Sequence, residues 1–347
     1  MAAALFVSAC GSSTTPTPPP PPPVEEAPTI TCPAAQSLQL TSGSAVPVTY
    51  PAPTTVNGRA PIAIVCTPPS GSSFTVGLST VNCTATDALQ RTDVCAFGIT
   101  VLGVPQLTTT TFLAFGDSIT LGEDGRNSAT LVPGSFQPRV VFPAGQTYPG
   151  VLKQSLIARY TTQASAIRVD NGGKGGESVS PPSSLDGPNA VTRFEGLLPG
   201  HGAVLIMEGT NDLQKAHGAS SSAEAEGIQS TAAAGLRQMV RDAKASGARP
   251  LIATLPPMNP TGTRGQLYGW ELVPGFNDRI AQIASLEQVP LVDVNKAFAG
   301  NLGLLGVDGV HPTADGYTLI ADTFFAAIKS NLETATTTAV LPFFRRR

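Results

Sequence analysis

The chain has 347 residues, a formal net charge of −3 and charged side chains at 13% of its positions. This length exceeds that of one average domain and leaves room for a large core beside a smaller module. The net charge is small, and the only dense basic run is formed by the three arginines at 345–347. These properties exclude a typical nucleic-acid-binding protein, and we expect two folded units.

The N-terminal segment, residues 1–10, is a short apolar stretch that ends at Cys10. Small residues precede this cysteine, as at the cleavage site of bacterial lipoprotein precursors, so the pattern predicts an exported protein with a lipid on Cys10. The stretch is shorter than an ordinary signal peptide and no Lys or Arg precedes it. An ordinary or truncated signal peptide, or a start upstream of Met1, therefore remains the alternative. Any membrane attachment is expected through this segment, because no other stretch is long and apolar enough to span a bilayer.

Residues 11–28 are rich in Ser, Thr and Pro, with an unbroken run of proline at 18–23. Such a composition predicts an extended, semi-rigid linker. After a lipidated cysteine, this linker would hold the folded domains away from the membrane surface.

The remaining four cysteines all lie in the next segment: Cys32, Cys66, Cys83 and Cys95. They predict two disulfides formed in an oxidising compartment, and the sequence leaves three pairings open. A zinc site is the alternative, but it is disfavoured because there is no CxxC pair and no histidine nearby.

Residues 29–104 are rich in Thr, Val and Ser and are interrupted by Pro and Gly. Short alternating runs at 63–66, 79–85 and 94–101 predict the strands of a small all-β sandwich. The sequences ITCP at 30–33, VCTPPSGSSFTVGLSTVNCTATD at 65–87 and CAFGITV at 95–101 resemble the hyalin-repeat (HYR) module, an immunoglobulin-like extracellular domain. This resemblance implies spacing, or contact with a cell surface or polysaccharide, rather than catalysis.

Residues 107–333 contain apolar strands that alternate with amphipathic helices, which is typical of an α/β fold with a parallel sheet. We predict strands at 111–115, 166–170, 203–207, 250–255 and 290–294, and helices near 148–160, 223–246, 276–286 and 314–332. The second helix carries Ile228, Leu236, Met239 and Val240 on one stripe, which we assign to the core. Residues 334–347 are expected to form a frayed tail.

Polar clusters follow the predicted strands, at the sheet edge where α/β proteins place their sites. The sequence GDSIT at 116–120 places Ser118 directly after the first strand, where a serine serves either as a nucleophile or as a helix N-cap. Further clusters occupy 171–177, 208–212 and 308–311. Together they offer candidates for the nucleophile, the base, the group that orients the base and the oxyanion donors that acyl transfer requires.

These four blocks, in this order, resemble the SGNH hydrolases, also called GDSL esterases and lipases. The resemblance covers about residues 111–332 and implies a flavodoxin-like three-layer α/β/α domain. It assigns the nucleophile to Ser118, the base to His311 and its orienting carboxylate to Asp308. The oxyanion hole would be formed by the backbone N–H groups of Ser118 and Gly176 and by the side-chain amide of Asn211.

The resemblance implies an esterase that forms an acyl-enzyme intermediate and needs no cofactor or metal. The lipoprotein-type N-terminus predicts that this esterase is bacterial. Short-chain acyl esters are the expected substrates, with carbohydrate or lipid esters as specific possibilities. Glu177 stands where the family often has Asp or another small polar residue, a difference that affects no predicted catalytic role. The segment 121–147 is long, contains Pro and Gly, and is expected to line the substrate pocket.

Two other functions remain as alternatives. Asp117, Asp212, Asp308 and His311 could bind a divalent metal in a phosphoesterase. The chain could also be a non-catalytic cell-surface adhesion protein. Outside these alternatives, Asp117 and Asp212 are predicted to be helix caps or loop braces. The other two histidines, His201 and His217, are predicted to lie on the surface.

Overall fold

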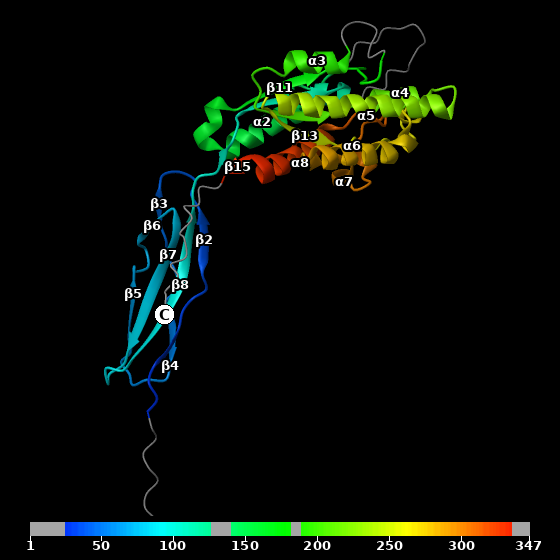
Figure 1. Cartoon of the computed structure of the whole chain (residues 1–347). Coiled ribbons are helices and arrows are strands. Elements are labelled where there is room, and N and C mark those ends of the chain that lie inside the picture. The colour runs from blue at the N-terminus through cyan, green and yellow to red at the C-terminus, as the bar shows by residue number, and fades with distance from the viewer. Residues whose placement is uncertain (1–24, 126–139, 182–188, 335–347) are drawn as a thin grey trace, which may run out of the picture. The chain divides into compact units, whose positions relative to one another are not determined.

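The computed structural model describes residues 25–125, 140–181 and 189–334 (Figure 1). The described chain divides into two units, one formed by residues 25–38 and 45–101 and the other by residues 39–44 and 102–334. The predictions for residues 1–24, including the lipidation of Cys10 and the linker, lie outside the described residues. Within the described residues, no helix combines the length and the apolar character needed to cross a membrane.

The first unit is all-β, as predicted. Its largest sheet has the order β2-β8-β7-β5, and two smaller sheets pair β1 with β4 and β3 with β6. The strands are β1 Thr29–Thr31, β2 Gln36–Gln39, β3 Ala45–Pro47, β4 Thr54–Val56, β5 Ala63–Thr67, β6 Ser73–Thr75, β7 Gly77–Thr86 and β8 Thr92–Leu102. In β7 the buried Val81, Cys83 and Ala85 alternate with more exposed polar residues, which is the pattern of a strand with one face in the core.

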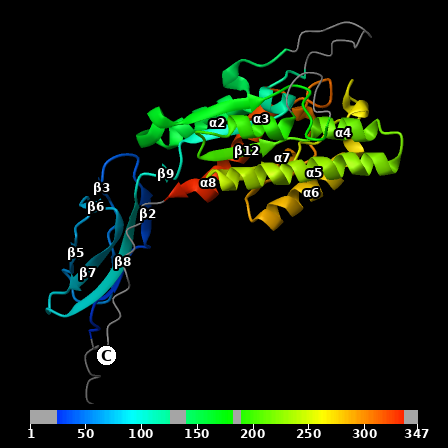
Figure 2. The same ribbon diagram turned by 45° about the horizontal axis from the view of Figure 1, so that its top comes forward.

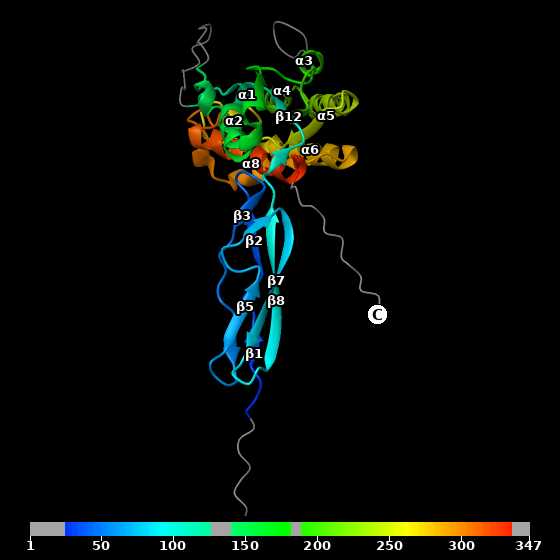
Figure 3. The same cartoon turned by 90° about the vertical axis from the view of Figure 1, so that its left-hand side faces the viewer.

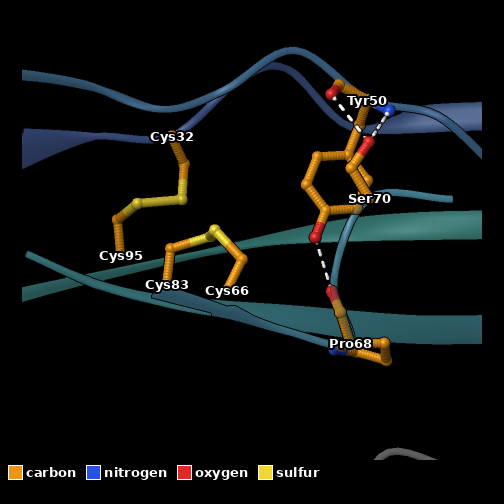
Figure 4. Close-up of a disulfide and its surroundings, with 7 residues drawn as sticks. All are labelled: Cys32, Tyr50, Cys66, Pro68, Ser70, Cys83 and Cys95. Atoms are coloured by element: carbon orange, nitrogen blue, oxygen red, sulfur yellow. Dashed lines mark hydrogen bonds between the residues drawn. A yellow bond between two sulfur atoms is a disulfide. The ribbon is translucent and has the colours of Figure 1, made fainter. Parts of the chain in front are cut away.

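Both predicted disulfides form, and the strand register places Cys83 opposite both Cys66 and Cys95 (Figure 4). Cys66 on β5 lies directly opposite Cys83 on β7, with their Cα atoms 4.1 Å apart. Cys95 on β8 pairs with Cys32, at a Cα separation of 5.7 Å. The sequence could not choose among the three pairings, because the choice depends on which strands are neighbours.

The second unit contains a parallel sheet with the order β11-β10-β12-β13-β14. In sequence order this is 2-1-3-4-5, the flavodoxin-like arrangement that was predicted. The strands are β10 Thr111–Gly116, β11 Arg168–Gly173, β12 Ala203–Met207, β13 Arg249–Ala253 and β14 Leu291–Val292. A short antiparallel pair joins β9 Gln106–Leu107 to β15 Glu333–Thr334.

Helices cover both faces of this sheet and create two separate cores (Figure 3). On β10, Phe112 and Ala114 face the core formed with α2 Tyr148–Arg159 and α8 Ala314–Leu332. Leu113 and Phe115 face the opposite core, formed with α3 Ala190–Leu197, α5 Ser222–Ala245 and α6 Val273–Glu287. The continuous burial of β10 thus follows because it is an interior strand of a sheet whose two faces are both covered by helices.

The predicted long helices are present, but several boundaries differ. Residues 166–167 precede β11, because Thr161–Ala166 forms a 3-10 helix. The last strand is short, because Asp293 accepts a hydrogen bond from Lys296 N and caps α7 Val294–Phe298. The helices α1 Ser118–Leu121, α3, α4 Thr210–His217 and α7 were not predicted.

The core-facing stripe of α5 is largely as predicted, and the helix packs beside α4 and α6 (Figure 2). Leu236, Met239 and Val240 are buried. Ile228 is only half-buried, so its assignment to the core was wrong. It lies in the N-terminal part of the helix, ahead of the stretch where α5 crosses the sheet core.

Candidate active site

Ser118 is the first residue of α1, just after the carboxyl end of strand β10. The N-cap of this helix is Asp117, whose Oδ1 accepts a hydrogen bond of 2.9 Å from Ile119 N. Ser118 is therefore not the N-cap of α1, and that alternative is wrong. Its hydroxyl makes no capping hydrogen bond to this helix. Gly116 is needed just before the turn, because a Cβ there would lie 2.1 Å from Thr120 Oγ1 and 2.2 Å from the carbonyl oxygen of Met207.

A chain of hydrogen bonds joins Ser118, His311 and Asp308. Ser118 Oγ lies 2.8 Å from His311 Nε2, and His311 Nδ1 lies 2.5 Å from Asp308 Oδ2. All three residues are buried, with exposures of 4%, 2% and 2%. In this geometry Nδ1–H donates to the carboxylate, so that Nε2 accepts the hydroxyl proton of Ser118.

The carboxylate of Asp308 is held by its own turn. Its Oδ1 accepts hydrogen bonds of 2.9 Å from the backbone N–H groups of Val310 and His311. Burial acts to raise the pKa of Asp308, but the hydrogen bonds and the charge of His311 outweigh it and lower the pKa overall. Asp308 therefore stays ionised while it orients the imidazole ring.

Asn211, on the first turn of α4, is brought against the second block. Its Nδ2 donates a hydrogen bond of 2.6 Å to the carbonyl oxygen of Glu177, the residue after Gly176. The next residue, Asp212, accepts hydrogen bonds of 2.9 and 2.7 Å from Val179 N and Ser180 N. Asp212 is thus a loop brace, as predicted, and these bonds fix α4 to the segment that contains Gly176.

Gly176 has a φ of +75°, a left-handed conformation that favours glycine. Within the described residues, the backbone N–H groups of Ser118 and Gly176 have no recorded hydrogen-bond acceptor. Each N–H group is therefore available to donate a hydrogen bond to a substrate oxygen.

Sequence reasoning missed Arg193, which lies on α3. Its guanidinium donates to both carboxylate oxygens of the fully buried Glu177 and to the carbonyl oxygens of Gly172 and Gly116. It also lies 4.2 Å from the ring centroid of Phe115. Glu177 is therefore a structural brace beneath the site, and Arg193 connects the ends of β10 and β11.

Two further acids lie buried at the ends of β10 and β12. Gly116 on β10 pairs with Met207 on β12. The residues that follow them, Asp117 and Glu208, are therefore adjacent at the carboxyl ends of these two strands. Burial raises the pKa of Asp117 to about 6. Burial, with the charges of Asp117 and other acids, raises the pKa of Glu208 well above its usual value. Within the described residues, Asp117 Oδ2 and Glu208 Oε1 have no hydrogen-bond partner.

Glu123 is a second residue that the sequence analysis did not single out. Its Oε2 lies 3.4 Å from His311 Nε2, the same nitrogen that faces Ser118. The available signal was an acidic residue five positions after Ser118, inside the segment assigned to the pocket wall.

The four residues of the metal-binding alternative are engaged in other contacts. Asp308 and His311 bind each other, Asp212 binds two backbone N–H groups, and Asp117 caps α1. Among the residues that the structure describes, no three His, Cys, Asp or Glu side chains are grouped as metal ligands.

The other two histidines differ from the prediction in part. The side chain of His201 is only 8% exposed and its Nε2 lies 2.9 Å from Asp170 Oδ2, so its assignment to the surface was wrong. Asp170 lies on β11, 31 residues before His201 in the sequence, so this contact could not be predicted from local spacing. His217 is 38% exposed, as expected, and its Nδ1 lies 2.6 Å from Glu271 Oε1.

Comparison with known families agrees with this geometry. Residues 114–319 match the family described as GDSL-like lipase/acylhydrolase. The chain belongs to this family. The resemblance to SGNH hydrolases is thereby confirmed, and the protein is a carboxylic ester hydrolase whose expected substrates are small-molecule esters. Residues 25–101 match the HYR domain, which confirms the second resemblance.

Solved structures show the same fold. The carbohydrate acetylesterase Est24 from Sinorhizobium meliloti is 18% identical, with a TM-score of 0.50 over 64% of this chain and 99% of that one. The aryl esterase of M. smegmatis is 20% identical, with a TM-score of 0.50 over 65% of this chain and 100% of that one. A search of curated proteins found no match.

Proposed function

We propose that the protein cleaves short-chain acyl esters with Ser118 as nucleophile, His311 as base and Asp308 as orienting carboxylate. The observation that carries this proposal is the unbroken hydrogen-bond chain from Ser118 Oγ through both ring nitrogens of His311 to Asp308. A nucleophile, a base within hydrogen-bond reach and a third group that orients the base are the parts that this chemistry needs.

In the first step, Ser118 Oγ attacks the ester carbonyl while its proton passes to His311 Nε2. Asp308 stabilises the resulting imidazolium through Nδ1–H without taking the proton itself. The imidazolium then protonates the leaving alcohol, and an acyl-enzyme remains on Ser118. A water molecule repeats the sequence, releases the acid and restores the serine.

The negative oxygen of the tetrahedral intermediate would be bound by the N–H groups of Ser118 and Gly176 and by the amide of Asn211. Asn211 uses one N–H for the Glu177 carbonyl, which fixes the amide plane and leaves a second N–H to donate. Loss of one such donor typically costs about a hundredfold in kcat.

For the substrate, we propose esters with short acyl groups, of which O-acetylated carbohydrate is the first class to test. The related fold of a carbohydrate acetylesterase and the HYR module both support this choice. The two disulfides and the HYR domain are compatible with an extracellular protein. We propose export, with anchoring through Cys10, and separate folding of residues 29–104 and 107–333.

The test is hydrolysis of p-nitrophenyl acetate, butyrate and palmitate by the wild type and by Ser118→Ala, with and without a chelator. We expect activity that is insensitive to the chelator and highest on the short esters. This activity should be lost in Ser118→Ala and retained in Ser285→Ala, an exposed control on α6. Activity that survives Ser118→Ala would refute the serine mechanism. Sensitivity to chelator would favour the metal-dependent phosphoesterase. Absence of both turnover and labelling by an active-site phosphonate would favour the adhesion protein.

A further inference from the structure

His311 lies between two carboxylates, one at each ring nitrogen. Asp308 contacts Nδ1, and Glu123 Oε2 lies 3.4 Å from Nε2. Nε2 is also 2.8 Å from Ser118 Oγ. The side chains of His311 and Glu123 are 3% and 7% exposed, so little solvent screens the contact between them.

The backbone of Glu123 is fixed to the nucleophile and to α8. The helix α1 ends at Gly122, whose φ of +99° reverses the chain. Glu123 N then donates a hydrogen bond of 3.0 Å to the carbonyl oxygen of Ser118, and Tyr317 OH donates one of 2.7 Å to the carbonyl oxygen of Glu123. An isolated β-bridge to Val141 completes this frame. Glu123 is therefore held in place by the same turn that presents Ser118.

The contact with Nε2 is most favourable when the ring of His311 is protonated, as it becomes during the reaction. A neutral imidazole carries one N–H, which at His311 is directed to Asp308, so Nε2 in the resting enzyme is an acceptor. When the proton of Ser118 arrives, Nε2 becomes a donor and the ring becomes positive. The neighbouring carboxylate then stabilises the ring, and an interaction that is stronger in the transition state than in the resting state accelerates the reaction.

We propose that Glu123 is a positioning residue that stabilises the protonated His311 from the side facing Ser118. This inference rests on the proposed serine mechanism. The proton moves from Ser118 Oγ to Nε2 and then to the leaving alcohol, and Glu123 neither gains nor loses one. Its effect is electrostatic and orienting, and it acts whatever other partners its carboxylate has.

Other groups act on the same ring. Asp308 precedes α8, and Asp117 caps α1 and interacts electrostatically with His311. Tyr317 of α8 interacts electrostatically with Glu123, Asp117, Asp308 and Asp124. All these ionisable groups are acidic or neutral at pH 7. Removal of Glu123 therefore takes away one of several negative charges, and Asp308 remains to hold the ring.

Glu123→Gln keeps the size of the side chain and removes its charge. Since the carboxylate favours the protonated ring in the free enzyme as well, its loss should move the acid limb of the kcat/KM profile to lower pH by about one unit. The plateau kcat should fall about tenfold, with KM changed little, because the lost interaction belongs to the transition state. Glu123→Asp keeps the charge, and its acid limb should lie closer to that of the wild type.

The experiment measures kcat and KM for p-nitrophenyl acetate from pH 4 to 9 (a range about the ordinary histidine value) in the wild type, Glu123→Gln, Glu123→Asp and Glu195→Gln. Glu195 is exposed on α3, so the last variant controls for net charge. Titration with an active-site phosphonate counts the folded sites, and melting temperatures detect a structural effect.

The inference is overturned if the acid limb of Glu123→Gln coincides with that of the wild type, or if its kcat per phosphonate-reactive site stays within twofold. A lower melting temperature with an unmoved profile would likewise show a purely structural role. If Glu123→Gln does not fold, Glu123→Ala replaces it in the comparison with Glu195→Gln, since only the Glu123 variant removes the charge beside His311 and should move the profile. Failure of the underlying mechanism is a separate result, because it appears as activity in Ser118→Ala.

Discussion

Arg193 of α3 forms a buried ion pair with Glu177, with Arg193 Nε 2.8 Å from Glu177 Oε2. The carboxylate is fully buried and the arginine side chain is 15% exposed. The same guanidinium also donates to the carbonyl oxygens of Gly172 and Gly116. The pair therefore connects the end of β10, which directly precedes the turn to Ser118, with the loop that contains Gly176.

Arg193→Met should destabilise the protein by about 3 kcal/mol. Among the residues that the structure describes, it leaves the buried Glu177 carboxylate with Lys174, 3.6 Å away, as its one cationic partner. Denaturant unfolding at neutral pH measures this change. The matched control is Arg279→Met, which breaks an ion pair with Glu226, whose side chain is 57% exposed. An exposed pair contributes less than about 1 kcal/mol. Equal effects of the two substitutions would contradict the structural role assigned to Arg193.

The two disulfides should contribute unequally to stability. Cys32–Cys95 closes a separation of 63 residues and Cys66–Cys83 one of 17. Loop-closure entropy predicts losses of about 4 and 3 kcal/mol on replacing each pair by serine. Chemical denaturation of the two double variants, followed by a probe in the HYR domain, measures the difference. A larger loss for the Cys66–Cys83 variant would show that local packing outweighs the closure entropy.

The principal features of the site could be predicted because the strands of a parallel sheet end at one edge. GDSIT stands at the end of β10 and GTND follows β12. Because these two strands are parallel neighbours, the side chains of both motifs lie close together, independent of the sequence between them. The D-x-x-H block supplied Asp308 and His311 together, since its spacing brings the carboxylate to Nδ1. The fold class followed in the same way from strands that are buried on both faces.

The residues that were missed depend on tertiary placement instead. Arg193 lies on an eight-residue helix, α3, that is too short for a clear periodic pattern, and its partner Glu177 comes from another loop. Glu123 approaches His311 only because Gly122 reverses the chain after α1. The pairing of Cys66 with Cys83 likewise depends on the register of β5 against β7. None of these contacts has a signature in local composition.

Asp117 should make the stability of the fold depend on pH. Burial raises its pKa to about 6, above its ordinary value of 3.8, so the folded state binds its proton more tightly than the unfolded state does. The contribution of Asp117 to the free energy of unfolding is therefore most favourable below pH 3.8. It falls as the pH rises from 3.8 to about 6, and above pH 6 the full cost of burying the charged carboxylate is present. Glu208, whose pKa is also raised, contributes in the same direction.

Asp117→Asn keeps an oxygen that can accept the Ile119 N–H and removes the ionisation. We expect it to stabilise the protein by about 3 kcal/mol at pH 8 and by almost nothing at pH 4, as a shift of this size implies. Urea unfolding of both proteins at the two pH values measures this difference. Asp322→Asn, an exposed change on α8, is the control. A gain for Asp117→Asn that is the same at both pH values would mean that the buried carboxylate carries no ionisation cost, and that its cap geometry alone determines its effect.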